Sequence, residues 1–299
     1  HAWTDELAAE VEIVAVCDRD RDRAEAAAAR FGVARVYADA AELFAAEALD
    51  FVDIVTTAES HRALVEHAAA AKVPVICQKP FGVDLADCRA MVEACAAAGV
   101  PLMVHENFRW QAALRRVHEL VGAGRIGRPF FARIAFRHGH DIYADQPYLA
   151  TEPRLAIQDL GIHLLDLARF YLGEATRLYA RTARINPAVV GEDAAVIVLD
   201  HAGGATSIVD CSFFTRTDPD PFPQTLVRIE GDAGTVELLQ GYRLVLDTAD
   251  GRHEEDVEPP VPAWGERPWH VIQESVVAIQ RHWLACLREG SEPATSGRD

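Results

Sequence analysis

The chain of 299 residues is too long for one ordinary domain and suits two. Half of its residues are hydrophobic and a quarter are charged, which supplies a sizeable core and argues against disorder. The net charge of −17 argues against a nucleic-acid partner, because binding phosphates requires a basic surface. No apolar run reaches the length of about 18 residues that a membrane-spanning helix needs, so no membrane partner is expected. The six cysteines form no C-x-x-C pair, which predicts reduced thiols in a cytoplasmic protein.

The first third of the chain alternates short apolar runs with alanine-rich stretches. The runs are rich in Val and Ile and show no polar alternation, as in strands buried on both faces of a parallel sheet. The alanine-rich stretches begin near Asp or Ser and end near Gly or Pro, as helices do. The expected strands are 11–17, 35–37, 51–56, 73–77 and 100–104, and the expected helices are 20–31, 60–71 and 84–98. This alternation predicts an α/β domain with a doubly wound parallel sheet over residues 1–108.

Strand patterns dominate after residue 109, with turn pairs between them. The expected helices are 111–121, 160–172 and 271–288, and the expected strands are 130–137, 178–185, 194–200, 206–213, 225–230, 235–239 and 242–246. Residues 109–299 are therefore predicted to form a second α/β domain, in which helices flank a mostly antiparallel open sheet.

Asp18 ends the first apolar run and is a candidate for binding a dinucleotide. In a dinucleotide-binding fold, an acid at this place accepts hydrogen bonds from ribose hydroxyls and follows a glycine-rich turn by about 20 residues. Counting back places that turn before His1, with residues 1–9 as the rest of the first helix. Asp18 favours NAD, whereas Arg19 suits the 2′-phosphate of NADP, so both cofactors stay open. The alternative is that Asp18 only starts a turn or caps the next helix.

The segment VDIVTTAESH at 52–61 carries small polar residues after a strand. Ligands of open α/β sheets bind at the carboxyl ends of the strands, which favours Thr56, Thr57 and His61 as cofactor-binding residues. Turn chemistry and helix capping by Ser60 explain the same residues equally well.

Lys79 follows another buried strand, in the segment VPVICQKP at 73–80. The chain has 29 basic residues, of which only Lys72 and Lys79 are lysine. A lysine retained against an arginine-rich background suits a role that needs an ammonium able to release its proton. Lys72 has a simpler explanation, because it ends a helix where a cation is favourable. We therefore expect Lys79 to act on a substrate hydroxyl or carbonyl, the alternative being a solvated loop residue.

Polar residues also mark the start of the second domain. Asn107 and Arg109, in VHENFRWQ at 104–111, are expected either to bind substrate or to hold the domain junction together. Asp159 and His163 are four residues apart on an expected helix and so share one face. A histidine can take or give a hydroxyl proton near neutral pH, and an aspartate one turn away can orient the substrate. The alternative is an N-cap aspartate and a core histidine.

These segments together resemble the Gfo/Idh/MocA oxidoreductases over essentially the whole chain. The resemblance rests on their order and spacing: VAVCD, VDIVTT with a following histidine, QKP, NFR, and D-x-G-x-H-x-x-D before YLG, with RIEGDAGTVEL at 228–238 further along. It implies a Rossmann domain, a second domain with a mostly antiparallel open sheet, and association into a homodimer or homotetramer through that sheet.

The resemblance also implies roles for single residues. Lys79 and His163 would handle the proton of a substrate hydroxyl while a hydride passes to or from the nicotinamide, and Asp159 would hold the substrate. Gln78 stands where the family usually has a glutamate, which removes a negative charge beside Lys79, and we assign it to the cofactor site.

The expected activity is an NAD(P)-dependent dehydrogenase acting on a secondary alcohol of a sugar, inositol or sugar acid. Further residues expected to line the substrate pocket are Arg109, His138, His140 and Tyr148. Two alternatives stay open. One is a non-catalytic nucleotide-binding or regulatory protein on the same fold. The other is a metal-dependent enzyme that uses a His/Asp ligand set, although the leading interpretation assigns no metal. The candidate ligands are His138, His140, Asp141, Asp159 and His163.

Overall fold

The computed structural model describes the whole sequence, His1–Asp299, and divides it into two compact units. Unit 1 comprises His1–Glu106 and Val276–Asp299, and unit 2 comprises Asn107–Ser275. This division differs from the expected domains at the chain's end, because residues 276–299 join the first unit instead of the second. The reason is a set of bonds between distant parts of the chain: Val104 donates its amide to the Thr295 carbonyl, and Met103 forms a bridge with Ser296.

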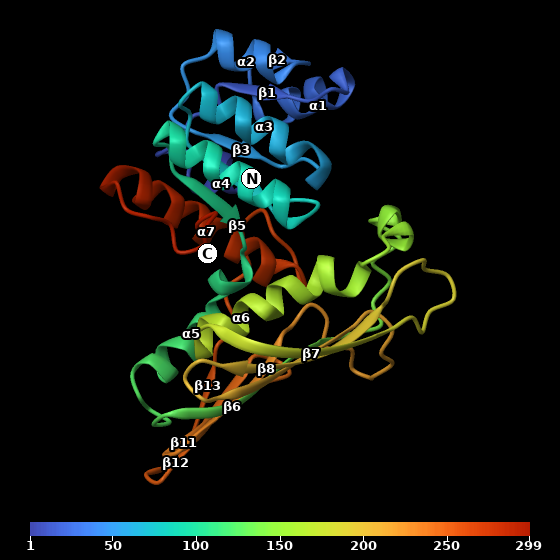
Figure 1. Ribbon diagram of the computed structural model, residues 1–299, viewed down its shortest axis with the longest axis vertical. Helices are drawn as coiled ribbons and strands as arrows, with labels where there is room; N and C mark the ends of the chain where they lie inside the picture. The colour runs from blue at the N-terminus through green and yellow to red at the C-terminus, as the bar shows by residue number, and fades with distance from the viewer. The chain divides into compact units, whose positions relative to one another are not determined.

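Unit 1 has parallel strands and alanine-rich helices in alternation (Figure 1). Its elements are, in chain order, a π-helical turn (Ala2–Glu6), β1 (Ala15–Cys17), α1 (Arg21–Phe31), β2 (Arg35–Tyr37), α2 (Ala40–Ala46), β3 (Val52–Ile54), α3 (Ala58–Ala70), β4 (Val75–Gln78), α4 (Leu85–Ala98) and β5 (Leu102–His105). The strands form two parallel sheets, β1-β2 and β3-β4-β5. The parallel pairing was predicted, whereas the split into two sheets was not. Within the first nine residues only Ala2–Glu6 are helical, as one π-helical turn, rather than the longer helix expected.

The helix ends of unit 1 follow from local chemistry. Asp20 accepts hydrogen bonds from the amides of Asp22 and Arg23 at the start of α1, and Asp84 caps α4 in the same way. Gly32 and Gly99 end the two helices with φ near +70°, which glycine adopts without strain. Apolar residues of β3, β4, α3, α4 and β5 then form the core of unit 1: Ile54, Val65, Val75, Cys77, Met91, Cys95 and Leu102.

Unit 2 is built on an eight-stranded sheet of order β13-β12-β11-β10-β6-β9-β8-β7. Its elements are α5 (Ala112–Gly122), β6 (Pro129–Arg137), a π-helical turn (Ala156–Gly161), α6 (Ile162–Leu172), β7 (Ala175–Ala183), β8 (Ala194–His201), β9 (Thr206–Ser212), β10 (Leu226–Gly231), β11 (Gly234–Leu239), β12 (Arg243–Thr248) and β13 (Gly251–Asp256), with two 3-10 turns at Phe108–Trp110 and Pro147–Thr151. The last helix, α7 (His270–Glu289), begins in unit 2 and continues into unit 1.

The sheet of unit 2 is mixed but mostly antiparallel, as predicted. Only β6 and β9 pair in parallel. Helices α5 and α6 lie on one face, where α6 packs on β6 and β9 and α5 packs on β11 (Figure 1). The core lies between these helices and the sheet, around Leu164, Leu167, Ile134, Val209 and Ile229. The other face of the sheet has no helix of unit 2 on it.

Candidate functional site

Polar residues of unit 1 collect at the carboxyl ends of its parallel strands, where such sheets bind ligands. Asp18 follows β1 and is half-buried. One of its carboxylate oxygens accepts a hydrogen bond from the amide of Asp20 at 2.9 Å. Asp18 therefore does start a turn, which was the alternative explanation for this residue. The turn fixes the direction of the carboxylate and is compatible with binding a ribose. Arg19 beside it is exposed.

The loop after β3 holds exposed hydroxyls at the start of α3. Thr57 is the N-cap residue of the helix, and Ser60 donates its hydroxyl to Thr56 Oγ1 at 2.7 Å. A hydrogen bond from Thr57 lowers the pKa of the Glu59 carboxyl. Thr56 and Thr57 are thus held in place at a helix N-terminus, which favours negatively charged groups.

His61 does not face outward with these hydroxyls, because its side chain is fully buried. Its Nδ1 lies 3.0 Å from the Phe81 carbonyl oxygen, and its Nε2 lies 3.1 Å from the Thr56 carbonyl oxygen. Thr56 follows β3 and Phe81 follows β4. The ring of His61 therefore lies between the two loops that leave neighbouring strands and can donate a hydrogen bond to a carbonyl oxygen of either one.

Gln78 and Lys79 stand at the carboxyl end of β4 and are both half-buried. The side-chain oxygen of Gln78 accepts the backbone amide of Lys79 at 2.9 Å, which holds the backbone at the position that bears the lysine. A glutamine serves in this bond as well as a glutamate would, but it adds no charge beside the ammonium. Cys77, just before them, is buried, and burial raises the pKa of its thiol, so this sulfur is an unreactive core group.

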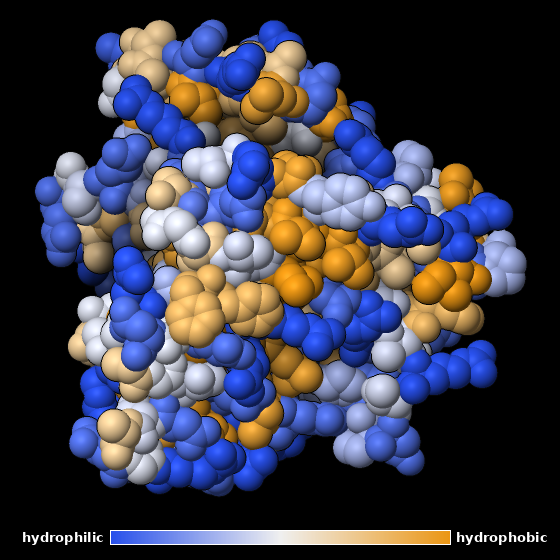
Figure 2. Space-filling model, turned by 60° about the horizontal axis from the view of Figure 1, so that its bottom comes forward, coloured by the Kyte–Doolittle hydropathy of each residue, from blue (hydrophilic) through white to orange (hydrophobic).

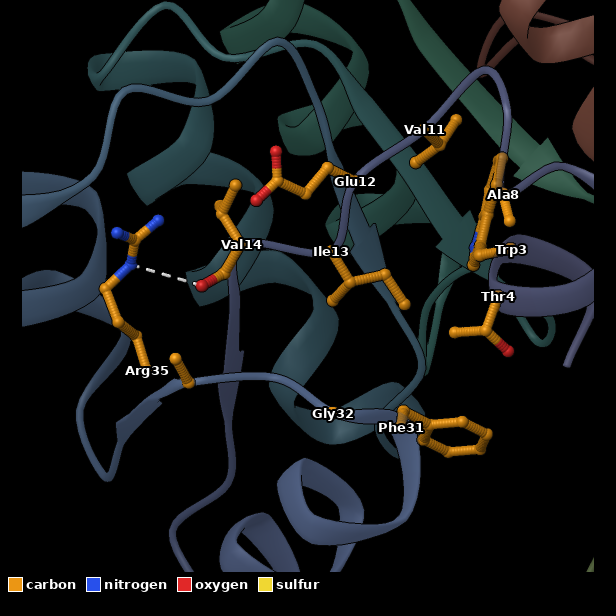
Figure 3. Close-up of a pocket in the computed structure, with 11 residues that line it drawn as sticks. Trp3, Thr4, Ala8, Val11, Glu12, Ile13, Val14, Phe31, Gly32 and Arg35 are labelled. Carbon is orange, nitrogen blue, oxygen red and sulfur yellow. Dashed lines mark hydrogen bonds between the residues drawn. The ribbon is translucent and has the colours of Figure 1, made fainter.

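A cavity of about 300 Å³ also lies in unit 1 (Figure 3). Its lining includes Val11, Ile13, Phe31 and Arg35, and Arg35 donates to the Val14 carbonyl at 3.2 Å. These residues lie at or before the amino-terminal ends of β1 and β2. Because ligands of open α/β sheets bind at the opposite ends of the strands, we assign this cavity no part in the dinucleotide site.

In unit 2, Asp159 and His163 come from two adjoining helical turns. Asp159 lies in the π-helical turn before α6, and His163 lies in the first turn of α6 itself. Gly161 between them has no Cβ, and an added one would lie 3.2 Å from the Ala156 carbonyl oxygen. Such π turns are often found at functional sites. The buried ring of His163 stacks on Phe108 with centroids 3.9 Å apart, which fixes its plane.

Arg109 and Asn107 are engaged within unit 2. Arg109 is buried and binds Asp166 through two hydrogen bonds of 2.5 Å, and its guanidinium lies over the Phe170 ring. Asn107 donates its side-chain amide to Ser275 Oγ at 2.7 Å. These contacts fit the structural alternative for both residues, because a buried bidentate ion pair holds its partners firmly. Their binding of substrate stays a prediction.

The remaining candidates of unit 2 lie after β6. His140 is exposed and stacks on Phe222, with centroids 4.2 Å apart. Tyr148 is exposed, and its hydroxyl donates to Gln146. His138 is buried among phenylalanines, and burial lowers the pKa of its ring to about 4. No group of three or more His, Cys, Asp or Glu side chains gathers as a metal ion requires, so the proposed His/Asp ligand set does not form.

Known families and proteins are similar to this chain along its length. A model of an oxidoreductase family with an NAD-binding Rossmann fold, GFO_IDH_MocA, matches residues 1–106, and a GFO/IDH/MocA C-terminal domain model matches residues 114–237. A D-apiose dehydrogenase of Paraburkholderia graminis is 56% identical over 299 residues, which cover all of this chain and 79% of that protein.

Two further similarities bear on chemistry. An inositol 2-dehydrogenase of Rhizobium meliloti is 28% identical over 97% of this chain and 86% of that protein. The crystal structure of an oxidoreductase from Agrobacterium radiobacter, in complex with NAD+, L-tartaric acid and magnesium, superposes with a TM-score of 0.95. It is 54% identical, and the match covers 96% of this chain and 84% of that one.

Proposed function

Since the chain belongs to the Gfo/Idh/MocA family and is an NAD(P)-dependent sugar oxidoreductase, we propose that it oxidises D-apiose, or a sugar of similar size, with NAD. The identity of the substrate rests on relatives more than half identical to this chain. The observation that carries the chemistry is the residue set at the family's motif positions. Lys79 follows β4, Asp159 lies in the π-helical turn before α6, and His163 lies in the first turn of α6.

The dinucleotide fits residues that the fold presents at the carboxyl ends of the strands of unit 1. The half-buried Asp18 carboxylate would accept hydrogen bonds from the ribose hydroxyls, and we assign Thr56, Thr57, Gln78 and Lys79 to the nicotinamide half. An acid at Asp18 disfavours a 2′-phosphate, so we expect NAD to be preferred over NADP even with the exposed Arg19 beside it. When bound, NAD supplies an acceptor for the hydride.

The reacting carbon of the sugar bears a hydroxyl, and oxidation removes a hydride from that carbon and a proton from its oxygen. We propose that the Lys79 amine and the His163 imidazole take part in removing that proton, which completes the carbonyl. Asp159 accepts a hydrogen bond from a substrate hydroxyl and fixes the carbon in place. The stacked contact with Phe108 keeps the imidazole in one orientation for this transfer.

The purified protein should reduce NAD with D-apiose, which the absorbance of the reduced nicotinamide measures. The kcat/KM should be higher with NAD than with NADP, and higher with D-apiose than with myo-inositol. Lys79→Ala and His163→Ala should each lower kcat by about 100-fold or more, the range typical of acid–base catalysis. Lys72→Asn is the matched control, because it removes the chain's other lysine from an exposed helix end. Near-normal rates in both variants would overturn the assigned roles. Binding of NAD without turnover of any sugar would favour a regulatory protein.

We also propose that copies of the chain associate through the open face of the unit 2 sheet. Every residue of β7 is exposed, and Tyr179 and Val196 are exposed on neighbouring strands. In Figure 2 hydrophobic residues gather among charged ones on the face turned forward. Exposed apolar side chains on a flat sheet suit an interface with a second copy.

A further inference from the structure

His138 is buried, and its ring makes no hydrogen bond of normal geometry. Its side chain is 1% exposed, and neither Nδ1 nor Nε2 has a partner at hydrogen-bond geometry, although the His140 backbone acts weakly on the ring. Three phenylalanines surround the ring with centroids 4.8–5.5 Å away: Phe136, Phe213 and Phe222. Nearly all buried polar groups in proteins are hydrogen-bonded, because leaving one unpaired costs stability. A histidine in this place needs an explanation that packing does not give.

The backbone around His138 is held firmly, so the ring has a fixed position. His138 donates its amide to the Ser212 carbonyl and accepts the amide of Thr215 on its own carbonyl. The next residue, Gly139, packs so closely on the Thr215 carbonyl oxygen that a Cβ would clash with it. These bonds join the end of β6 to the end of β9 and the loop after it, and they fix the backbone from which the imidazole extends.

Asp220 connects this turn to one of the phenylalanines. Its carboxylate accepts the amide of Gly139 at 2.7 Å and the amide of Phe222 at 2.9 Å. Phe136 and Phe213 are buried, whereas Phe222 is half-buried and stacks on exposed His140. Phe222 is therefore the least buried of the three rings around His138, and the side next to Phe222 is the one nearest to solvent.

The charge of the proposed substrate-holding carboxylate also acts on the ring. Burial lowers the pKa of His138 to about 4; the charges of Asp220 and Asp159 raise it, and His140 acts in both directions, through its charge and its backbone. His138 is therefore neutral near pH 7 and offers one hydrogen-bond donor and one acceptor. A hydroxyl group is the ligand that matches this pair, since it can both donate and accept. Charged ligands match it less well.

We propose that His138 is a specificity-determining residue that hydrogen-bonds a hydroxyl of the sugar, on the side of the substrate next to Phe222. This inference rests on the proposed function, because it names a contact of the same substrate. A site that pairs a buried polar group with a substrate hydroxyl strongly rejects analogues that lack it. The unpaired imidazole thus serves substrate selection, and it lowers the stability of the protein without substrate.

The test replaces His138 by phenylalanine, which keeps a flat ring in an aromatic surrounding but removes both nitrogens. We expect the KM for D-apiose to rise about tenfold or more, with the KM for NAD unchanged within about twofold. The melting temperature should stay equal or rise, because an unpaired buried polar group has been removed. His138→Gln, which restores a donor and an acceptor, should recover part of the sugar affinity.

His201 provides the matched control, since it is an equally buried histidine of the same unit. Its Nδ1 lies 2.7 Å from the Gly173 carbonyl oxygen and its Nε2 lies 2.9 Å from Ser207 Oγ. His201→Phe should lower the melting temperature and leave the KM for D-apiose unchanged. A wild-type KM for the sugar in His138→Phe would overturn this inference alone. A wild-type protein that oxidises no sugar would overturn the proposed function, and this inference with it.

Discussion

Three buried histidines of unit 2 show how one residue type takes different roles. His201 has a hydrogen-bond partner for each ring nitrogen, and His163 stacks face to face on Phe108. His138 has neither arrangement and meets only the edges and tilted faces of phenylalanines. Burial is nearly equal in the three, so the partners of the ring decide whether a histidine stabilises the fold or is available to a ligand.

The lowered pKa of His138 makes a prediction about acid stability. The folded protein binds a proton on this ring only near pH 4, whereas an unfolded chain binds it near pH 6.5. As the pH falls from 6.5 to 4, the unfolded state therefore takes up more protons and the folded state loses stability. The loss from this one group is about 3 kcal/mol.

His138→Phe lacks this titration, so its free energy of unfolding should fall by about 3 kcal/mol less than that of the wild type between pH 7 and pH 4. Urea unfolding of both proteins at both pH values measures these changes. Subtracting the change of the variant from that of the wild type cancels the contributions of all other groups. Parallel pH dependences of the two proteins would show that the ring is not held in its neutral form.

At the scale of elements, unit 1 depends on contacts between loops as much as on the sheets. His61 belongs to α3, and its ring lies between carbonyl oxygens of the loops after β3 and β4. These loops carry the hydroxyls of Thr56 and Thr57 and the side chain of Lys79. We therefore propose that His61 positions the loops of the proposed cofactor site; its direct contact with the cofactor stays a prediction.

His61→Ala should raise the KM for NAD about tenfold, because both loops lose their common support, and should leave the KM for the sugar much less affected. His67→Ala is the control, since His67 is exposed on the same helix. Fluorescence titration with NADH separates binding from turnover. If the variant bound NADH as tightly as the wild type, the loops would not depend on His61.

At the scale of the whole molecule, the open sheet of unit 2 makes a prediction about assembly. Tyr179→Asp together with Val196→Asp places two charges on the exposed face of β7 and β8 and should convert oligomers into monomers. Light scattering coupled to gel filtration measures the mass directly. Val261→Asp is the control, because Val261 is an exposed apolar residue in a loop outside the sheet. An unchanged mass in the double variant would place the interface elsewhere, or show that the protein is monomeric.

No helix of the structure is both long and apolar enough to cross a membrane. This agrees with the absence of long apolar runs in the sequence. The family models match both halves of the chain, and the sheet types predicted for both halves are present. Most strands and helices lie within a few residues of their predicted ranges, because buried apolar runs and capping residues act locally.

Two elements escaped prediction for physical reasons. Helix α2 has only seven residues, too few for a clear apolar period, although Asp39 caps it. Strand β13 is polar and exposed throughout, and it forms only because the turn at Gly251 folds it back on β12. Residues 276–299, which the sequence assigns to the second half, group with unit 1 because their pairing with β5 is a contact between distant parts of the chain.

The sequence by itself determined the family, the order of strands and helices and the motif residues Lys79, Asp159 and His163, because these depend on local pattern and spacing. Tertiary structure decided what surrounds each side chain. It placed His61 behind two loops, paired Arg109 with Asp166, and left His138 without a partner among phenylalanines. Residues far apart in the chain supply those partners, and no local pattern of one sequence reveals which distant residues will meet.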